Sequence, residues 1–253
     1  CYQVVDGRRR AVDARYEIVD AANGTFRYDV GSYDPSRTLV LDPEYVFGFT
    51  LGGDMQSEYF PILDLDNQNN MYVTGETLSE DFPVTPGAYD ENHYGDNGDS
   101  DAFITKISAD GTSIVYSTFL GGNGSERGYD IEVDADGSAY VLVGDTGSDF
   151  PEIPAGTNSQ FTSKYFLVKI NTDGSNLEYS RKVGSSGYAL SINDILLANN
   201  NTIYLTGIVG GTDGYPMTKD GYDTKIDGIN CFVSKFSADG ELLSSTYLGN
   251  TYS

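Results

Sequence analysis

The stretch DAFITKISADGTSIVYSTFLGG, residues 101–122, occurs three times in this chain of 253 residues, each later copy with losses. It returns as KYFLVKINTDGSNLEYSRKVGS at 164–185 and as NCFVSKFSADGELLSSTYLGN at 230–250. A second shared segment precedes the copies, reading MYVTGET at 71–77, AYVLVGDT at 139–146 and IYLTGIV at 203–209. Recurrence about every 65 residues indicates tandem structural units. We place these units at 54–122, 123–185 and 186–250.

Each unit has the pattern of four β-strands. In the middle unit the predicted strands are 129–134, 139–145, 165–171 and 177–183. Asp136-Gly137 and Asp173-Gly174 suit the hairpin turns, because glycine accepts a positive φ at little cost. The second strand is apolar on both alternations, which predicts cover on both of its faces. The first strand alternates, with Ile131 and Val133 on one side and acidic residues on the other.

Tandem four-stranded units are typical of propeller blades, whereas solenoid repeats are shorter. The extra length lies between the second and third strands of each unit, at 79–101, 148–164 and 215–230. The fold class predicted is therefore all-β, with about three blades of four antiparallel strands. Three blades cannot close a ring, so we expect further blades from the same longer chain or from other chains.

The first unit carries the segments that resemble a known family. They are Phe82-Pro83-Val84-Thr85-Pro86-Gly87-Ala88-Tyr89, Asp101-Ala102-Phe103, Lys106, Asp110-Gly111 and Ser117-Thr118-Phe119-Leu120-Gly121-Gly122. In this order they resemble the bacterial and archaeal seven-bladed β-propeller repeat family. The second unit departs at Arg181-Lys182-Val183, and the third lacks the Asp of the turn at 198–201. The resemblance implies a secreted or surface protein, usually without a known reaction, and assigns no catalytic residue.

Residues 1–44 differ from the repeats, which occupy 45–253. They have short alternating runs with turn signals at Asp6-Gly7, Asn23-Gly24 and Asp34-Pro35. This segment resembles the end of the β-rich domain that often precedes these repeats.

The charge balance excludes whole classes of function. The net charge is −23, with 38 acidic against 15 basic residues. Nucleic-acid binding needs a basic surface, so we expect no nucleic-acid partner. No run of about 18 apolar residues occurs, so we expect no membrane insertion. Two cysteines, Cys1 and Cys231, are too few for a disulfide framework.

The sequence assigns no catalytic, cofactor-binding or metal-ligating residue. The single histidine, His93, lies in the longest loop and is interpreted as a solvated residue rather than a base. Asp64-Leu65-Asp66-Asn67 and Asp134-Ala135-Asp136-Gly137 resemble partial calcium loops. Both lack the bidentate Glu at the twelfth position, where Gly75 and Asp145 stand.

Calcium is therefore a minor alternative, which also includes the acidic loop Asp96-Asn97-Gly98-Asp99-Ser100-Asp101. The favoured interpretation is that these are hairpin turns in which Asp and Asn bond their own backbone. The tyrosines of the long loops, Tyr89, Tyr94, Tyr215 and Tyr222, either pack their loops against the blades or bind a glycan or protein at one rim.

The function expected is a non-enzymatic, secreted or cell-surface scaffold for adhesion, protein or glycan binding, or envelope architecture. The alternative is a metal-assisted hydrolase or lyase that acts on an extracellular polymer. An enzyme would need convergent titratable groups in a pocket, with shifted pKa values.

Overall fold

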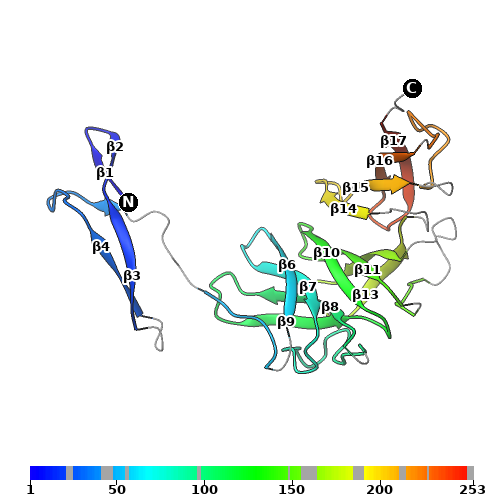
Figure 1. The fold of residues 1–253 in the computed structure, drawn as a ribbon, viewed down its shortest axis with the longest axis horizontal. Helices are drawn as coiled ribbons and strands as arrows, with labels where there is room; N and C mark the ends of the chain where they lie inside the picture. Colours follow the sequence, from blue (N-terminus) through cyan, green and yellow to red (C-terminus); the bar gives the residue numbers. More distant parts are fainter. Residues whose placement is uncertain are drawn as a thin grey trace. The chain divides into compact units, whose positions relative to one another are not determined.

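A computed structural model of the chain describes residues 1–20, 25–40, 48–54, 57–95, 98–147, 149–154, 164–184, 191–210, 215–226 and 228–249. The chain divides into two units, Cys1–Gly48 and Phe49–Ser253 (Figure 1). Throughout the described ranges the regular elements are β-strands, which confirms the predicted all-β class. A helix long and apolar enough to cross a membrane is not found in these ranges.

The N-terminal unit consists of two small antiparallel sheets. One has the strand order β2-β1-β5, from Arg8–Ala11, Tyr2–Val5 and Leu39–Val40. The other pairs β3 (Ala14–Asp20) with β4 (Thr25–Val30). The predicted turn between β1 and β2 is confirmed, because Asp6 and Gly7 both have positive φ, at 52° and 75°. The predicted turn at Asn23-Gly24 lies outside the described residues.

The second unit contains three four-stranded antiparallel sheets, as the repeats predict. The first sheet is β6 (Glu58–Leu65), β7 (Met71–Thr77), β8 (Asp101–Ile107) and β9 (Ile114–Leu120). The second sheet is β10 (Glu126–Val133), β11 (Ala139–Asp145), β12 (Tyr165–Ile170) and β13 (Leu177–Lys182). The third sheet is β14 (Ser191–Leu197), β15 (Ile203–Gly210), β16 (Ile229–Phe236) and β17 (Leu242–Leu248). In each sheet the strands pair in chain order, so every connection is a hairpin.

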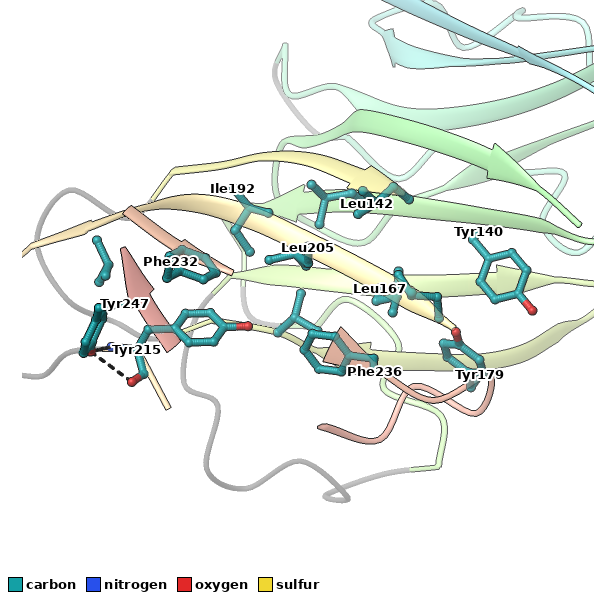
Figure 2. Close-up of a cluster of buried hydrophobic side chains, with 14 residues drawn as sticks. Tyr140, Leu142, Leu167, Tyr179, Ile192, Leu205, Tyr215, Phe232, Phe236 and Tyr247 are labelled. Atoms are coloured by element: carbon teal, nitrogen blue, oxygen red, sulfur yellow. Dashed lines mark hydrogen bonds between the residues drawn. The ribbon is translucent and has the colours of Figure 1, made fainter. Parts of the chain in front are cut away.

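Two apolar clusters hold the three sheets in a stack. Alternate residues of β11 enter different clusters: Val141 and Val143 join residues of the first sheet, whereas Tyr140 and Leu142 join residues of the third. Figure 2 shows the cluster between the second and third sheets, with Leu142 and Leu167 beside Ile192 and Leu205. The prediction that the second strand of the middle unit is covered on both faces is therefore confirmed. Burial of aliphatic side chains of this size stabilises the stack by about 1.5–3 kcal/mol each.

Carboxylates connect the first strands of neighbouring sheets. Asp64 Oδ2 in β6 accepts a hydrogen bond from the backbone N–H of Val133 in β10, at 2.8 Å. Asp130 Oδ2 in β10 accepts one from the N–H of Ile195 in β14, at 2.7 Å. Burial raises the pKa of Asp130 to about 7 despite this hydrogen bond, and the nearby Asp194 carboxylate adds to the increase. The counterpart of Asp64 in β10 is Glu132, whose Oε2 accepts from the N–H of Leu197 in β14 at 3.3 Å, so a side-chain acceptor at this register connects both pairs of successive sheets.

A β-bulge interrupts the first strand of every sheet at the same register. It lies between Tyr59 and Ile62 in β6, between Gly128 and Asp130 in β10, and between Ile192 and Asp194 in β14. Across from the bulge the second strand has Gly75 in β7, Val143 in β11 and Gly207 in β15, whereas Gly144 of β11 pairs with Arg127, one position further along. A Cβ on Gly144 would lie 2.6 Å from the ring of Tyr129, the bulged residue of β10. In β11 the glycine beside the bulge therefore leaves room for Tyr129, and the bulge redirects the side chains next to it.

Candidate binding pocket

A cavity of about 340 Å³ opens beside the bulge of β10, between the first and second sheets. The first sheet contributes Glu76 from β7 and Ser100, which directly precedes β8. The second sheet and its loops contribute Ser125, Arg127, Tyr129, Gly144, Asp145, Thr146, Lys164 and Tyr165. This volume is within the range of small-molecule sites. The lining combines two cations, two carboxylates, two tyrosines and several hydroxyls.

Two tyrosines form the aromatic wall of the pocket. Tyr129 lies over Gly144, and its ring meets that of Tyr165 edge-on, with the ring centroids 5.4 Å apart. Burial raises the pKa of Tyr165 to about 12, and the neighbouring Tyr129 adds to this increase. Both rings are half-buried. They therefore offer apolar surface and hydroxyl groups to a molecule in the pocket.

Arg127 connects this wall to the first sheet through aromatic contacts. Its Cζ lies 3.4 Å from the ring centroid of Phe60 and 4.7 Å from that of Tyr129. Such contacts hold a guanidinium by its face, so its N–H groups remain available in the plane. Arg127 Nε is buried and has no hydrogen-bond partner among the described residues. The same part of the chain supplies no carboxylate within 4 Å of this guanidinium.

Phe60 adopts an unusual backbone conformation to make this contact. Its φ is +55°, a region that bulky side chains rarely enter. Such a conformation costs about 1–3 kcal/mol and is concentrated at functional sites. Phe60 also stands in the bulge of β6, next to Pro61, and half of its side chain is exposed. The strained residue and the unpaired guanidinium therefore meet at one place.

Acidic and hydroxyl groups face the two cations in this pocket. Burial raises the pKa of Glu76, and the positive charge of Arg127 only partly offsets that increase. The exposed Lys164 donates to the carbonyl oxygen of Thr146. Ser125 donates through Oγ to Asp99 Oδ1 at 2.7 Å, which ties the loop before β8 to the start of β10. The pocket thus presents hydrogen-bond donors and acceptors of both charges.

A pair of fully buried acids lies behind the pocket wall. Glu126 Oε2 accepts from the N–H of Gly122 at 2.7 Å, while its Oε1 is buried without a partner among the described residues. Burial raises the pKa of Glu126 to about 8, and the charges of Asp145 and Asp101 contribute. Burial also raises the pKa of Asp101, whose Oδ2 accepts from the N–H of Tyr94 at 2.9 Å. These groups are enclosed by protein, so a large substrate cannot reach them.

The two predicted calcium turns are hairpins held by their own aspartates. Asp66 Oδ1 accepts from the N–H groups of Gln68 and Asn70, each at 2.9 Å. Asp134 Oδ1 accepts from Asp136 and Ser138 at 3.0 and 2.9 Å. In both turns the Asp therefore accepts hydrogen bonds from the backbone of its own hairpin, as the favoured interpretation predicts.

A lysine lies beside each of these two aspartates. Lys106 Nζ is 3.5 Å from Asp66 Oδ2, and Lys169 Nζ is 3.8 Å from Asp134 Oδ2. Burial opposes ionisation of Asp66, but its hydrogen bonds from Asn70 and Gln68 and the charge of Lys106 lower its pKa overall. Within the residues described, His, Cys, Asp and Glu form no group of three that could hold a metal ion. In the acidic loop, Asp96 lies outside the described residues, and Asp99 and Asp101 make the bonds given above.

The interpretation of His93 as a solvated residue is wrong. Its ring is half-buried and lies edge-on to Phe119, with centroids 5.5 Å apart. Its Nε2 lies 3.2 Å from the carbonyl oxygen of Thr77. The edge-on contact with Phe119 stabilises the imidazole ring and keeps water away from that side of it. His93 thus anchors its loop to the first sheet and does not line the pocket.

The four loop tyrosines divide into two pairs. Tyr215 is buried against Phe232, with centroids 3.9 Å apart, and Tyr89 packs on the cluster between the first two sheets. Tyr94 and Tyr222 are exposed, Tyr222 almost completely. Two of the tyrosines therefore pack their loops, while two remain available at the surface.

The pocket residues were not predicted from the sequence. Arg127 and Tyr129 occupy a strand that begins at Glu126, three positions before the predicted start at residue 129. The available signal was Gly144, because a glycine inside a strand indicates a bulge or a close approach of another group. That signal points to Tyr129 but not to Phe60, which comes from the preceding unit.

Comparisons with known proteins identify only the N-terminal segment. A model described as "Domain of unknown function (DUF7948)" matches residues 1–44. These are the same residues that differ in sequence from the repeats. A search of curated proteins finds no relative of the chain.

Proposed function

We propose that this chain is part of a secreted or cell-surface β-propeller that acts as a non-enzymatic binding scaffold. Its three four-stranded sheets stack through one repeated interface, as the blades of a propeller do. The resemblance of the repeats to the seven-bladed β-propeller repeat family supports the same function. So does the strongly acidic composition, which is suited to an extracellular protein that must remain soluble.

The uncovered outer faces of the stack carry this proposal. Leu63 in β6 is 55% exposed, whereas Ile131, at the same register in β10, is 2% exposed beneath the first sheet. Tyr204 in β15 is 36% exposed, whereas its counterpart Tyr140 in β11 is fully buried beneath the third sheet. Both end sheets therefore present residues that the middle sheet buries. Further blades, from the same longer chain or from other chains, would cover them.

The carboxylates Glu126 and Asp101 are enclosed, which favours binding over catalysis, although Glu76, whose pKa burial also raises, lines the pocket. Glu126 and Asp101, whose pKa values burial raises, are fully enclosed and cannot contact a polymer. Asp66 and Asp134 are engaged by backbone N–H groups and lysines. A metal-assisted hydrolase or lyase would need such groups to be accessible. The accessible features are the pocket and the exposed loop tyrosines Tyr94 and Tyr222, which suit a protein or a glycan.

Binding to arrays of extracellular glycans and proteins tests this function. The fluorescently labelled chain should retain a defined set of glycans or proteins, and incubation with the same molecules should yield no cleavage products. Release of products from any retained polymer would contradict the non-enzymatic part of the proposal. Retention of nothing by a correctly folded chain would contradict the binding part.

A further inference from the structure

Arg127 lines the pocket beside the bulge of β10, and no carboxylate of the described residues lies within 4 Å of its guanidinium. Glu76 lines the same pocket and acts on Arg127 through its charge alone. Within the described residues, Arg127 makes only aromatic contacts, to Phe60 and Tyr129. A guanidinium held by its faces presents two parallel N–H groups at its edge, and a carboxylate accepts both at once. The chain has 38 acidic residues. An arginine with which no carboxylate of the described ranges forms an ion pair points to an acidic group from another molecule.

The walls around Arg127 suit a sugar ring rather than an extended apolar group. The half-buried rings of Tyr129 and Tyr165 offer a surface for the C–H face of a ring. Glu76, Ser100 and Thr146 provide acceptors and donors for ring hydroxyls. A cavity of about 340 Å³ has room for one or two sugar residues. Lys164 adds a second positive charge at an exposed position.

We infer that this pocket binds a carboxylate-bearing sugar of the uronate kind. Arg127 pairs with the carboxylate, the two tyrosines contact the ring, and Glu76 accepts hydrogen bonds from ring hydroxyls. Lys164 attracts the acidic ligand from solution. This inference rests on the proposed binding function and specifies its ligand. The strained Phe60 has a role in the same arrangement, because its ring fixes the plane of the guanidinium before the ligand arrives.

Calorimetric titration with a galacturonate trisaccharide tests the inference, with the fully methyl-esterified trisaccharide as the matched uncharged ligand. The acid should bind at least about tenfold more tightly than the ester, because a charge-assisted pair is lost with the ester. Increasing the salt concentration should weaken binding of the acid and leave the ester unaffected. Equal affinity for the two trisaccharides would overturn the assignment of the carboxylate to Arg127.

Two variants and a control identify the residues. Arg127→Gln should lower the affinity for the acid by about tenfold or more, and its thermal unfolding shows whether the fold is retained. Lys164→Gln removes an exposed charge together with its hydrogen bond to the carbonyl oxygen of Thr146, and should lower the affinity by about two- to fivefold. Lys219→Gln removes one exposed positive charge in a different loop and should have no effect. Undiminished binding by both pocket variants would overturn the inference.

The ligand controls separate this inference from the proposed function. If the chain binds a neutral glycan or a protein on the arrays but not the galacturonate trisaccharide, the inference fails and the scaffold function stands. Preference for a sulfated sugar of the same size over the uronate would also overturn it, because a guanidinium also pairs bidentately with such an anion and the ligand would then not be a carboxylate. If nothing binds on the arrays, the proposed scaffold function fails together with the uronate inference.

Discussion

The second and third sheets are copies of one unit, yet only the second is covered on both faces. Tyr140 in β11 is fully buried, whereas Tyr204, its counterpart in β15, is 36% exposed. The Tyr140–Lys169 contact of the second sheet has its equivalent in Tyr204 and Lys235, at 5.1 and 5.7 Å from ring centroid to Nζ. The backbone pairing is therefore the same in both sheets, and what differs is the presence of a neighbour.

The third sheet differs from the second at a position that contacts the next sheet and at a turn position. Tyr179 in β13 packs under the turn at Gly240, which follows β16, and Ser244 stands at its register in β17. Asp134 closes the first hairpin of the second sheet, and Ala198 stands at the equivalent turn. The two sheets therefore differ both at a residue that contacts the next sheet and at a residue that closes its own hairpin.

The largest expected difference in stability is between truncating a leucine on a covered face and truncating one on an uncovered face. Leu142→Ala should destabilise the chain by about 2–5 kcal/mol, because Leu142 is fully buried between the second and third sheets. Leu196→Ala should change the free energy of unfolding by less than about 0.5 kcal/mol, because Leu196 is 57% exposed. Urea unfolding at several protein concentrations measures both. A large loss for Leu196→Ala would show that another molecule covers this face in solution.

The next effect concerns pH and the buried Glu126. Its folded pKa of about 8 exceeds the ordinary value of 4.5, so the folded state holds the proton more tightly than the unfolded state. The resulting stabilisation is complete below about pH 4.5 and is lost as the pH rises to about 8, at up to about 1.4 kcal/mol per pH unit. Asp130 has a raised pKa and contributes in the same direction.

Glu126→Gln isolates this contribution. A glutamine can still accept from Gly122 and can donate to Asp145 at any pH. The variant should therefore gain stability relative to the wild type as the pH rises from about 4.5 to 8, measured by urea unfolding at each pH. Asp145→Thr introduces the residue that the first sheet has at this position, Thr77. There Glu58 takes the place of Glu126, and the hydroxyls of Thr77 and Ser79 lie 3.3 and 2.8 Å from its Oε1. This variant should also reduce the pH dependence of the free energy of unfolding. If both variants differ from the wild type by the same free energy at every pH, Glu126 is not the source of the pH dependence.

The sequence predicts the sheets well and the pocket poorly, for a physical reason. Strand identity depends on local alternation and on turns such as Asp136-Gly137, where Gly137 has the expected positive φ of 90°. The pocket depends on Phe60 and Arg127, which meet only after two sheets have stacked. The bulge at Tyr129 also interrupts the alternation, so the predicted strand began three residues late. Packing between units has no signal in the periodicity of one unit.

A smaller effect should follow from exchanging the turn residues of the two sheets. Asp134→Ala removes an acceptor of two backbone N–H groups and should cost about 1–3 kcal/mol. Ala198→Asp places the acceptor in a turn with the same backbone bonds, Ala198 N to Thr202 O and Asn201 N to Ala198 O. It should stabilise the chain by about 0.5–2 kcal/mol. Thermal unfolding measures both variants, and a loss on Ala198→Asp would show that the third-sheet turn is not equivalent.

The smallest expected effect is that of calcium, because the carboxylates that resemble its ligands are already engaged. Asp66 and Asp134 each accept two backbone N–H groups and lie beside a lysine. A cation would have to displace that lysine. We therefore expect the same melting temperature in excess EDTA and in millimolar calcium. A ligand at a hundred times its Kd would stabilise the chain by about 2.7 kcal/mol, so a rise of several degrees would show a calcium site. Loss of that rise in Asp134→Ala but not in Asp66→Ala would then assign it to the second sheet.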